Sequence, residues 1–341
     1  MPSSPKLAII IACYNYESFV DRAIQSILKQ ARDDCELVVV DDGSTDGSWD
    51  VISRSGVTAF RIENSGARRA CLFGLDKTRA PFVLFLDADD ELKPGSLGKI
   101  IDRLDQDVAK LQFPLTRIDA DGNVISGAFP PLETFRSRDS LARHVLRSGV
   151  YRSPPTSGNV FRRDLCELLR EADYDKFVDG VILLAAPFFG DVVSISEEIG
   201  CYRIHGRNDS GLGRSPDAAS FQRDIDRYLA RMEHLRTVIR RREPNQDLFD
   251  PRETFYFREL KFCLDIASGQ RPRALLGLVP KLLGEPFSVK NKVAMAAFYT
   301  LASVLPNDRG KALLAFRFKT GPRTALGFAK EIIRPRAPSR A

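Results

Sequence analysis

The chain lacks any apolar run long enough to cross a membrane. A spanning helix needs about 18 or more apolar residues. The longest candidate, 293–305, has 13 residues and includes Thr300 and Ser303. The apolar run at 7–13 is short and leads directly into polar residues, which argues against a signal peptide. We therefore expect a cytoplasmic protein without a membrane-spanning segment.

Cysteine patterns typical of metal sites are also missing. The six cysteines form no CxxC pair and no metal-ligand spacing, and several lie inside apolar runs. This pattern favours buried free thiols in a reducing compartment.

The net charge of +6 conceals an asymmetry along the chain. Residues 271–341 carry 14 Lys or Arg and 3 Asp or Glu, whereas the preceding residues carry 37 and 42. A basic tail of this kind favours an acidic partner, and an anionic membrane surface is the leading candidate. A solvated basic face gives the same pattern. No nucleic-acid-binding motif accompanies the charge, so we expect no nucleic-acid partner.

The first part of the chain alternates strand and helix patterns. Short apolar or β-branched runs are typical of buried strands, and the runs between them have helical spacing. The strand runs lie at 6–12, 36–40, 57–62 and 82–86, and the helical runs at 15–30, 49–54 and 66–77. This order predicts an α/β fold with a doubly wound, mostly parallel, Rossmann-like sheet. Later candidate strands lie at 110–117, 191–196 and 199–203.

Two motifs of nucleotide-binding proteins are absent from this predicted sheet. No GxGxxG follows its first strand, and the chain has no Walker A sequence. The sequence therefore supports neither a usual dinucleotide-binding fold nor a P-loop NTPase.

Acidic residues follow two of the predicted strands. Asp87, Asp89 and Asp90 come directly after one buried run, and Asp41 and Asp42 come at the end of another. Open α/β sheets bind ligands at the carboxyl ends of their strands. Two hard oxygen ligands close together suit Mg2+ or Mn2+, ions that also hold phosphates. An acidic turn that caps the next helix is the alternative.

The same edge of the sheet offers groups for the rest of a nucleotide. Tyr14 and Asn15 follow the first strand. The aromatic ring would meet the base, Asp42 the base or ribose, and the metal the phosphates. A packed core tyrosine and turn chemistry around Gly43 are the alternatives. We therefore predict a site for a nucleoside diphosphate.

Three segments resemble the family 2 glycosyltransferases, which have a GT-A fold. They read LAIIIACYN at 7–15, VVVDDGSTDGS at 38–48 and FLDADD at 85–90, and their order and spacing also agree. The resemblance implies an inverting transferase that uses a nucleotide-activated sugar, often a UDP- or GDP-sugar. It implies that Asp42 contacts the base, that Asp87 contacts the ribose or metal side of the donor, and that Asp89 ligates the divalent ion.

The segment at 64–74 departs from the family pattern. Asn64 and Gly66 match, but Cys71 and Leu72 stand where relatives have an Arg-Asn pair, so no role is transferred to these two residues. Asn64 is a further candidate for the donor site, together with the two acids Asp41 and Asp90.

An inverting transfer requires a base. A carboxylate opposite the leaving diphosphate takes the proton of the acceptor hydroxyl, and the metal stabilises charge on the diphosphate. The resemblance places this acid at the start of a helix after the metal motif, where Asp179 precedes the apolar run 180–184. A helix N-terminus favours the ionised carboxylate. Asp175 and Asp173 are the alternative bases, and an N-cap is the alternative role.

The segment 201–210 also resembles the family. The resemblance implies that His205 completes the metal or diphosphate site. Arg203 and Arg207 are candidates for contacts with the diphosphate. A structural histidine is the alternative.

Glycine, serine and proline at 211–216 indicate a linker. We therefore predict a catalytic domain at 1–212 and an all-helical region at 213–341, with 334–341 disordered. The basic amphipathic helices of this region can lie on an anionic membrane at the inner face of the cell. A cover over the acceptor cleft or a homodimer interface would produce the same pattern.

The leading hypothesis is a metal-dependent inverting glycosyltransferase. Its acceptor would be a saccharide or lipid-linked hydroxyl in cell-surface polysaccharide synthesis. A nucleotidyltransferase that forms an activated sugar is the first alternative, but it would need a glycine-rich signature with Arg and Lys after the first strand, which 14–17 lacks. A non-catalytic nucleotide-sugar-binding protein is the second, and it would be expected to lack the metal pair or the base.

Overall fold

The chain forms two compact units in the computed structural model, which describes residues 4–206, 208, 217–272, 275–285 and 287–318. Unit 1 comprises Met1–Leu146, Val150–His205 and Glu233–Asp247, and unit 2 comprises Arg147–Gly149, Gly206–Met232 and Leu248–Ala341. The predicted boundary at 212, the linker at 211–216 and the disorder at 334–341 lie outside the described residues.

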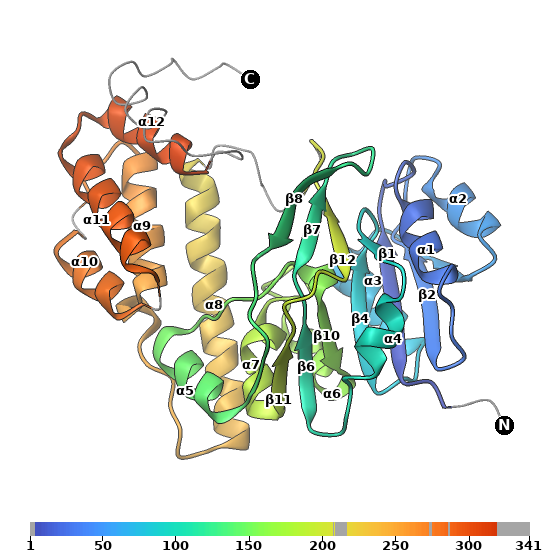
Figure 1. Ribbon diagram of the computed structural model, residues 1–341. Helices are drawn as coiled ribbons and strands as arrows, with labels where there is room; N and C mark the ends of the chain where they lie inside the picture. The colour runs from blue at the N-terminus through green and yellow to red at the C-terminus, as the bar shows by residue number, and fades with distance from the viewer. Residues whose placement is uncertain (1–3, 207, 209–216, 273–274, 286, 319–341) are drawn as a thin grey trace. The chain divides into compact units, whose positions relative to one another are not determined.

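Unit 1 is built on an eight-stranded sheet (Figure 1). The strand order is β3-β2-β1-β4-β10-β6-β11-β9. The strands are β1 (Leu7–Cys13), β2 (Cys35–Asp41), β3 (Thr58–Arg61), β4 (Phe82–Asp87), β6 (Val108–Gln112), β9 (Phe135–Ser137), β10 (Asn159–Arg162) and β11 (Asp191–Ser194). The four strands β1 to β4 pair in parallel, which confirms the predicted doubly wound half.

Helices cover this parallel half. α1 (Val20–Leu28), α2 (Ser48–Arg54) and α3 (Ala67–Asp76) connect its strands and pack against them. β1 is apolar at every position and almost completely buried, as expected of a strand between two helical layers.

A second sheet is formed by strands that follow β4 in the sequence. Its order is β5-β12-β7-β8. The strands are β5 (Glu91–Leu92), β7 (Leu115–Ile118), β8 (Val124–Phe129) and β12 (Gly200–Arg203). The continuous strand expected at 110–117 is therefore two strands in different sheets. Pro114 lies between them, and a proline cannot donate a ladder hydrogen bond.

The remaining elements of this part of the chain are short, and several support the strand ends. They are α4 (Ser96–Ile101), α5 (Asp139–Ser148), η1 (Thr156–Gly158), α6 (Arg163–Cys166), η2 (Glu167–Glu171) and α7 (Val181–Phe189). All six cysteines of the chain are free, and four of them are buried.

The described part of unit 2 is helical, as predicted. Its elements are the first part of α8 (Ala218–Arg242), η3 (Pro251–Glu253), α9 (Phe255–Ala267), α10 (Leu275–Gly284), α11 (Val289–Val304) and α12 (Asn307–Phe318). An aromatic cluster of Phe255, Phe262, Phe298 and Tyr299 fills its core. Within the described ranges, no helix has the length and apolarity needed to cross a membrane.

Gly74 gives α3 its close approach to the sheet. A Cβ at this position would lie 2.5 Å from Ile10 Cγ2 and 3.4 Å from Val40 Cγ2. We expect Gly74→Ala to lower the free energy of unfolding by about 1–3 kcal/mol, because a packed core accommodates an added methyl group poorly. Gly98→Ala in α4 is the matched control, since the nearest atom to its Cβ is Arg32 Nη1 at 3.6 Å. Urea unfolding of both variants measures the difference, and equal midpoints would contradict the packing argument.

Candidate active site

The carboxyl ends of β1, β2 and β4 meet at one edge of the sheet. The strand register pairs Cys13 with Asp41 and Ala12 with Asp87. The acids that end β2 and β4 therefore flank the end of β1, which is where the sequence predicts a ligand.

The residues after β1 form hydrogen bonds with the loop after β2. Asn15 has a φ of +60°, a left-handed conformation that asparagine tolerates. Its backbone N–H donates to Ser44 Oγ at 3.0 Å, and its side-chain Oδ1 accepts from Thr45 N at 2.8 Å. The neighbouring Tyr14 is 44% exposed, so it is not a packed core tyrosine. The Tyr14 ring is therefore accessible to a nucleobase.

The two acids at the end of β2 have different surroundings. Asp42 accepts hydrogen bonds from the backbone N–H groups of Ser65 and Gly66, both at 2.8 Å. This carboxylate therefore fixes the turn that starts α3. Asp41 is fully buried and pairs with Arg61 at 3.2 Å, and its Oδ1 has no hydrogen-bond partner.

Asn64 lies in the loop before this turn, and its side chain is exposed. Its backbone nitrogen is 2.8 Å from the position of a Cβ on Gly43, whose φ is +71°. Glycine is therefore required after Asp42, because any side chain there would meet the 62–64 loop and would need the left-handed conformation.

Three carboxylates gather after β4. Asp87, Asp89 and Asp90 each offer an oxygen, and these oxygens lie within 4.8 Å of one another. Asp90 is fully buried; its Oδ1 accepts from Arg203 N at 2.9 Å, and its Oδ2 has no hydrogen-bond partner. Burial, together with the charges of Asp89 and Asp87, raises the pKa of Asp90 well above its ordinary value.

These carboxylates fit a hard divalent cation. A cation would offset the mutual repulsion of the three acids. Oxygen ligands from carboxylates are those that Mg2+ and Mn2+ prefer. The buried Asp90 Oδ2 without a hydrogen-bond partner is the observation in this structure that favours such an ion.

His205 faces the same acids. Its Nε2 lies 2.9 Å from Asp89 Oδ2, and its ring stacks on Phe19 at 4.8 Å between centroids. The side chain of His205 is 6% exposed. The structure therefore brings an imidazole nitrogen to the carboxylate that the sequence predicts as the principal metal ligand.

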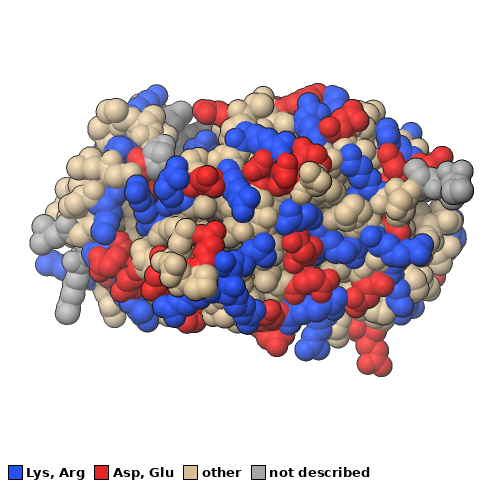
Figure 2. Space-filling model, turned by 90° about the horizontal axis from the view of Figure 1, so that it is seen from below, with Lys and Arg blue, Asp and Glu red and all other residues tan. Residues whose placement is uncertain are grey.

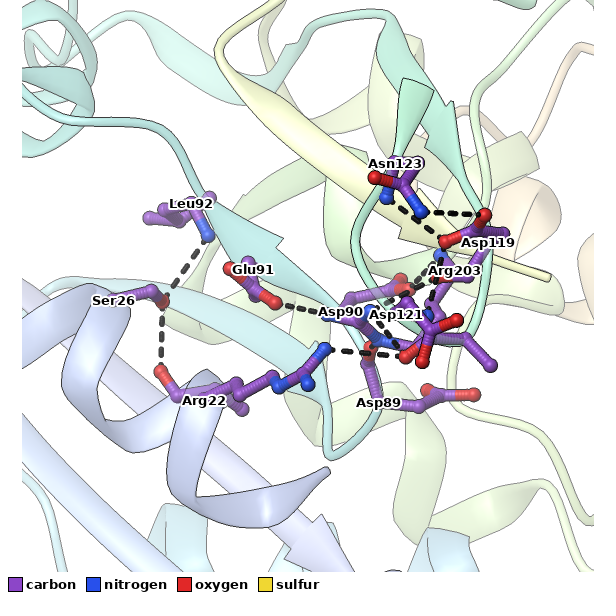
Figure 3. Close-up of polar contacts among 12 residues, drawn as sticks. Arg22, Ser26, Asp89, Asp90, Glu91, Leu92, Asp119, Asp121, Asn123 and Arg203 are labelled. Atoms are coloured by element: carbon purple, nitrogen blue, oxygen red, sulfur yellow. Dashed lines mark hydrogen bonds and ion pairs between the residues drawn. The ribbon is translucent and has the colours of Figure 1, made fainter. Parts of the chain in front are cut away.

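Arg203 is fully buried, and its guanidinium group forms hydrogen bonds with other parts of the chain (Figure 3). Its Nε donates to Asp89 O at 2.8 Å, its Nη1 donates to Asp119 O at 3.0 Å, and its Nη2 pairs with Glu91. The guanidinium thereby joins β12, the acidic loop at 87–90 and the 119–123 turn. This geometry favours a structural role over contact with a diphosphate. The other candidate, Arg207, lies outside the described residues.

Asp179 lies just before α7. The N-cap position of the helix is Gly180, so Asp179 lies one residue before the cap. Asp179 is half-buried, and Thr156 Oγ1 donates to its Oδ2 at 3.3 Å. Ser157, next to Thr156 on η1, accepts a hydrogen bond from Asp87 N at 3.1 Å. One short helix thus contacts both the predicted base and the acidic loop.

The two alternative acids have other partners. Asp175 is buried, and its Oδ1 accepts from Phe177 N at 3.2 Å. Asp173 is exposed and pairs with Arg68 at 2.6 Å. Asp179 is linked to η1 by the hydrogen bond from Thr156, and η1 is linked to the acidic loop by Ser157, which favours Asp179 as the base.

Comparison with known proteins identifies glycosyltransferases as relatives of this chain. A model of glycosyl transferase family 2 matches residues 8–166. An uncharacterized glycosyltransferase of Nostoc sp. is 34% identical over 215 residues, which span 60% of this chain and 66% of that protein. A GalNAc(5)-diNAcBac-PP-undecaprenol β-1,3-glucosyltransferase of Campylobacter jejuni is 32% identical over 127 residues, which span 35% of this chain and 41% of that protein.

A solved structure shares the fold. TarS 1-349 of Staphylococcus aureus in complex with UDP-GlcNAc aligns with a TM-score of 0.53 at 16% identity, covering 91% of this chain and 90% of that one. The architecture is therefore of the GT-A type, followed by helices. Residues 8–166 belong to glycosyl transferase family 2, which confirms the predicted family and the glycosyltransferase class of enzyme.

Proposed function

We propose that this chain transfers a sugar from a nucleoside-diphosphate donor to a hydroxyl group, with inversion at the anomeric carbon. One observation carries the proposal. A cluster of three carboxylates at the end of β4 is linked through η1 to a fourth carboxylate, Asp179. The cluster suits a metal and a diphosphate, and the separate acid suits a base.

Each part of the site has a chemical role in this proposal. Asp89 and His205 would hold Mg2+ or Mn2+, with Asp87 and Asp90 beside them. The ion supplies positive charge to the departing diphosphate. Tyr14 stacks on the base, while Asn15 and Asp42 fix the two loops that enclose it.

Asp179 takes the proton from the acceptor hydroxyl as the new bond to the anomeric carbon forms. Thr156 donates to Asp179 Oδ2 and so fixes the orientation of the carboxylate. The leaving nucleoside diphosphate keeps the electron pair of the broken bond. Inversion follows because the base and the leaving group act on opposite faces of the sugar.

The names of the relatives support a donor and an acceptor class. The C. jejuni protein is named as a glucosyltransferase acting on a saccharide linked to PP-undecaprenol. We therefore propose a saccharide or lipid-linked acceptor and a place in cell-surface polysaccharide synthesis. A UDP-sugar is the first donor to test, because the TarS structure of the same fold holds UDP-GlcNAc.

The test is release of nucleotide from a panel of UDP- and GDP-sugars, with Mn2+ or with EDTA, in the presence of membrane-extracted acceptors. We expect one donor to be turned over only with the metal. Formation of pyrophosphate from a sugar 1-phosphate and a nucleoside triphosphate would instead identify a nucleotidyltransferase. Binding of a nucleotide-sugar without turnover of any donor would favour a binding protein.

We also propose that unit 2 contacts an anionic membrane surface. Val289 and Val293 lie four residues apart on α11 and are 78% and 64% exposed, with Lys290 and Lys292 beside them. Basic and acidic side chains are interspersed on the face that Figure 2 shows. The exposed valines of α11 carry this proposal. A homodimer interface remains the alternative prediction.

Co-sedimentation with vesicles tests the membrane contact. The intact chain should pellet with vesicles rich in phosphatidylglycerol and less with neutral vesicles, and the double variant Val289→Glu, Val293→Glu should remain in solution. Equal pelleting of the two proteins would contradict the contact. A loss of self-association in the variant, measured by light scattering, would favour the dimer.

A further inference from the structure

A lysine lies inside the sheet of unit 1 without an ion pair. Lys110 is on β6 and is fully buried. Within the described ranges, no carboxylate lies within salt-bridge distance of its Nζ. A buried charge is very unfavourable unless hydrogen bonds compensate for lost water. The reaction proposed above assigns this residue no role.

Three hydrogen bonds surround the ammonium group of Lys110. Its Nζ donates to Gln112 Oε1 at 2.8 Å, Ser153 Oγ at 2.8 Å and Tyr151 OH at 3.1 Å. This set uses all three donors of an ammonium group. Tyr151 OH in turn donates to Leu183 O in α7 at 2.6 Å. Lys110 therefore connects β6 to the 151–153 segment and, through it, to α7.

The same hydrogen bonds lead to η1. Ser153 Oγ donates to Asn159 Oδ1 at 3.0 Å, and Asn159 Nδ2 donates to Pro155 O at 2.9 Å. These bonds fix the chain on both sides of η1, the helix that carries Thr156. Thr156 donates to Asp179, the proposed base. A series of hydrogen bonds, joined through the backbone of η1, thus runs from Lys110 to Asp179.

Lys110 and Asp179 also interact through their charges. Burial lowers the pKa of Lys110 well below its ordinary value, and the negative charge of Asp179 opposes this decrease. The interaction is reciprocal, so a charged Lys110 favours the ionised form of Asp179. The other groups around Nζ are the neutral Gln112, Ser153 and Tyr151.

We propose that Lys110 is a positioning residue for the transfer reaction. It fixes the 151–159 segment, and with it the Thr156 hydroxyl that orients Asp179. In its protonated form it also places a positive charge in the core that acts on this carboxylate. The inference rests on the proposed function, in which Asp179 is the base.

Lys110→Met in the intact chain tests the proposal. We expect kcat to fall by about 10- to 100-fold, because a small displacement of a reacting group is enough for such a loss. Calorimetric affinity for UDP with Mn2+ should be unchanged, since Tyr14, Asp42 and Asp89 are not altered. The acidic limb of the profile of kcat/KM against pH should move to higher pH, because the ionised base loses a favourable charge.

Two further variants separate anchoring from charge. Ser153→Ala and Tyr151→Phe each remove one bond to Lys110 and retain the lysine. They should lower kcat without moving the acidic limb, and they carry the test if Lys110→Met does not fold. Lys99→Met, which removes an exposed lysine paired with Glu197, is the matched control.

The outcomes distinguish this inference from the proposed function. A folded Lys110→Met with wild-type kcat and an unmoved acidic limb would overturn the inference. A lower kcat with an unmoved limb would support anchoring and overturn the effect of charge. Asp179→Asn is measured in the same series. If that variant retains activity, the proposed base is wrong and the failure belongs to the proposed function.

Discussion

Asp179→Asn is expected to lower kcat by about 10^2- to 10^4-fold, because an amide cannot accept the proton of the acceptor hydroxyl. Binding of the nucleotide should be unchanged, since the variant keeps the proposed donor-site residues Tyr14, Asp42 and Asp89. The variant should also fold normally, because an amide has the same shape as the half-buried carboxylate that it replaces. Turnover under saturating donor, together with calorimetry of nucleotide binding, measures both effects.

Asp173→Asn is the matched control for this experiment. The side chain of Asp173 is 84% exposed and pairs with Arg68, outside the proposed site. Arg68 is buried but keeps its hydrogen bond to Leu169 O, and the amide of the variant remains in solvent, so this variant should retain wild-type turnover. If Asp173→Asn or Asp175→Asn loses activity and Asp179→Asn retains it, the base has been assigned to the wrong carboxylate.

Asp89→Ala is expected to remove the metal dependence of the enzyme. It deletes the member of the acid cluster that contacts His205. We expect kcat/KM to fall by about a thousandfold, because the charge that stabilises the leaving diphosphate is lost. Electron paramagnetic resonance of Mn2+ bound to the protein, titrated with and without nucleotide, measures the site directly.

The stability of this variant separates loss of the site from loss of the fold. Removing one of three neighbouring acids relieves repulsion in the metal-free protein. The melting temperature without metal should therefore stay the same or rise, although His205 loses its hydrogen bond. Asp121→Asn, an exposed acid in the nearby 119–123 turn, is the control. Unchanged Mn2+ binding by Asp89→Ala would contradict the assignment of the metal site.

The sequence predicts the parallel half of the fold because its strands are short apolar runs at regular spacing. The acids lie at the ends of β2 and β4, as expected, since charged residues directly after a buried strand must lie at its end. The prediction failed at 110–117, because the pattern of apolar residues does not reveal that the chain changes sheets around Pro114. The antiparallel β10, inserted between β4 and β6, was also not predicted, since its partners are distant in sequence.

The burial of Arg203 and Lys110 and the identity of their hydrogen-bond partners could not be predicted from the sequence for a similar reason. Arg203 follows an ordinary strand pattern, and its partners Asp89 and Asp119 are 114 and 84 positions away. Lys110 sits in an apolar run, and the groups that solvate it come from 151–153. Local spacing identifies groups that share an edge or a face. It does not identify partners that only the folded chain brings together.

The most direct test of a metal-dependent donor site is calorimetric titration of the intact chain with UDP, GDP and TDP, each with Mn2+ and with EDTA. The geometry at the ends of β1, β2 and β4 predicts that one nucleotide binds with Mn2+ and that EDTA abolishes or strongly weakens the binding. Equal affinity in Mn2+ and EDTA would contradict the metal site. The absence of binding to all three nucleotides by folded protein would contradict the proposed function.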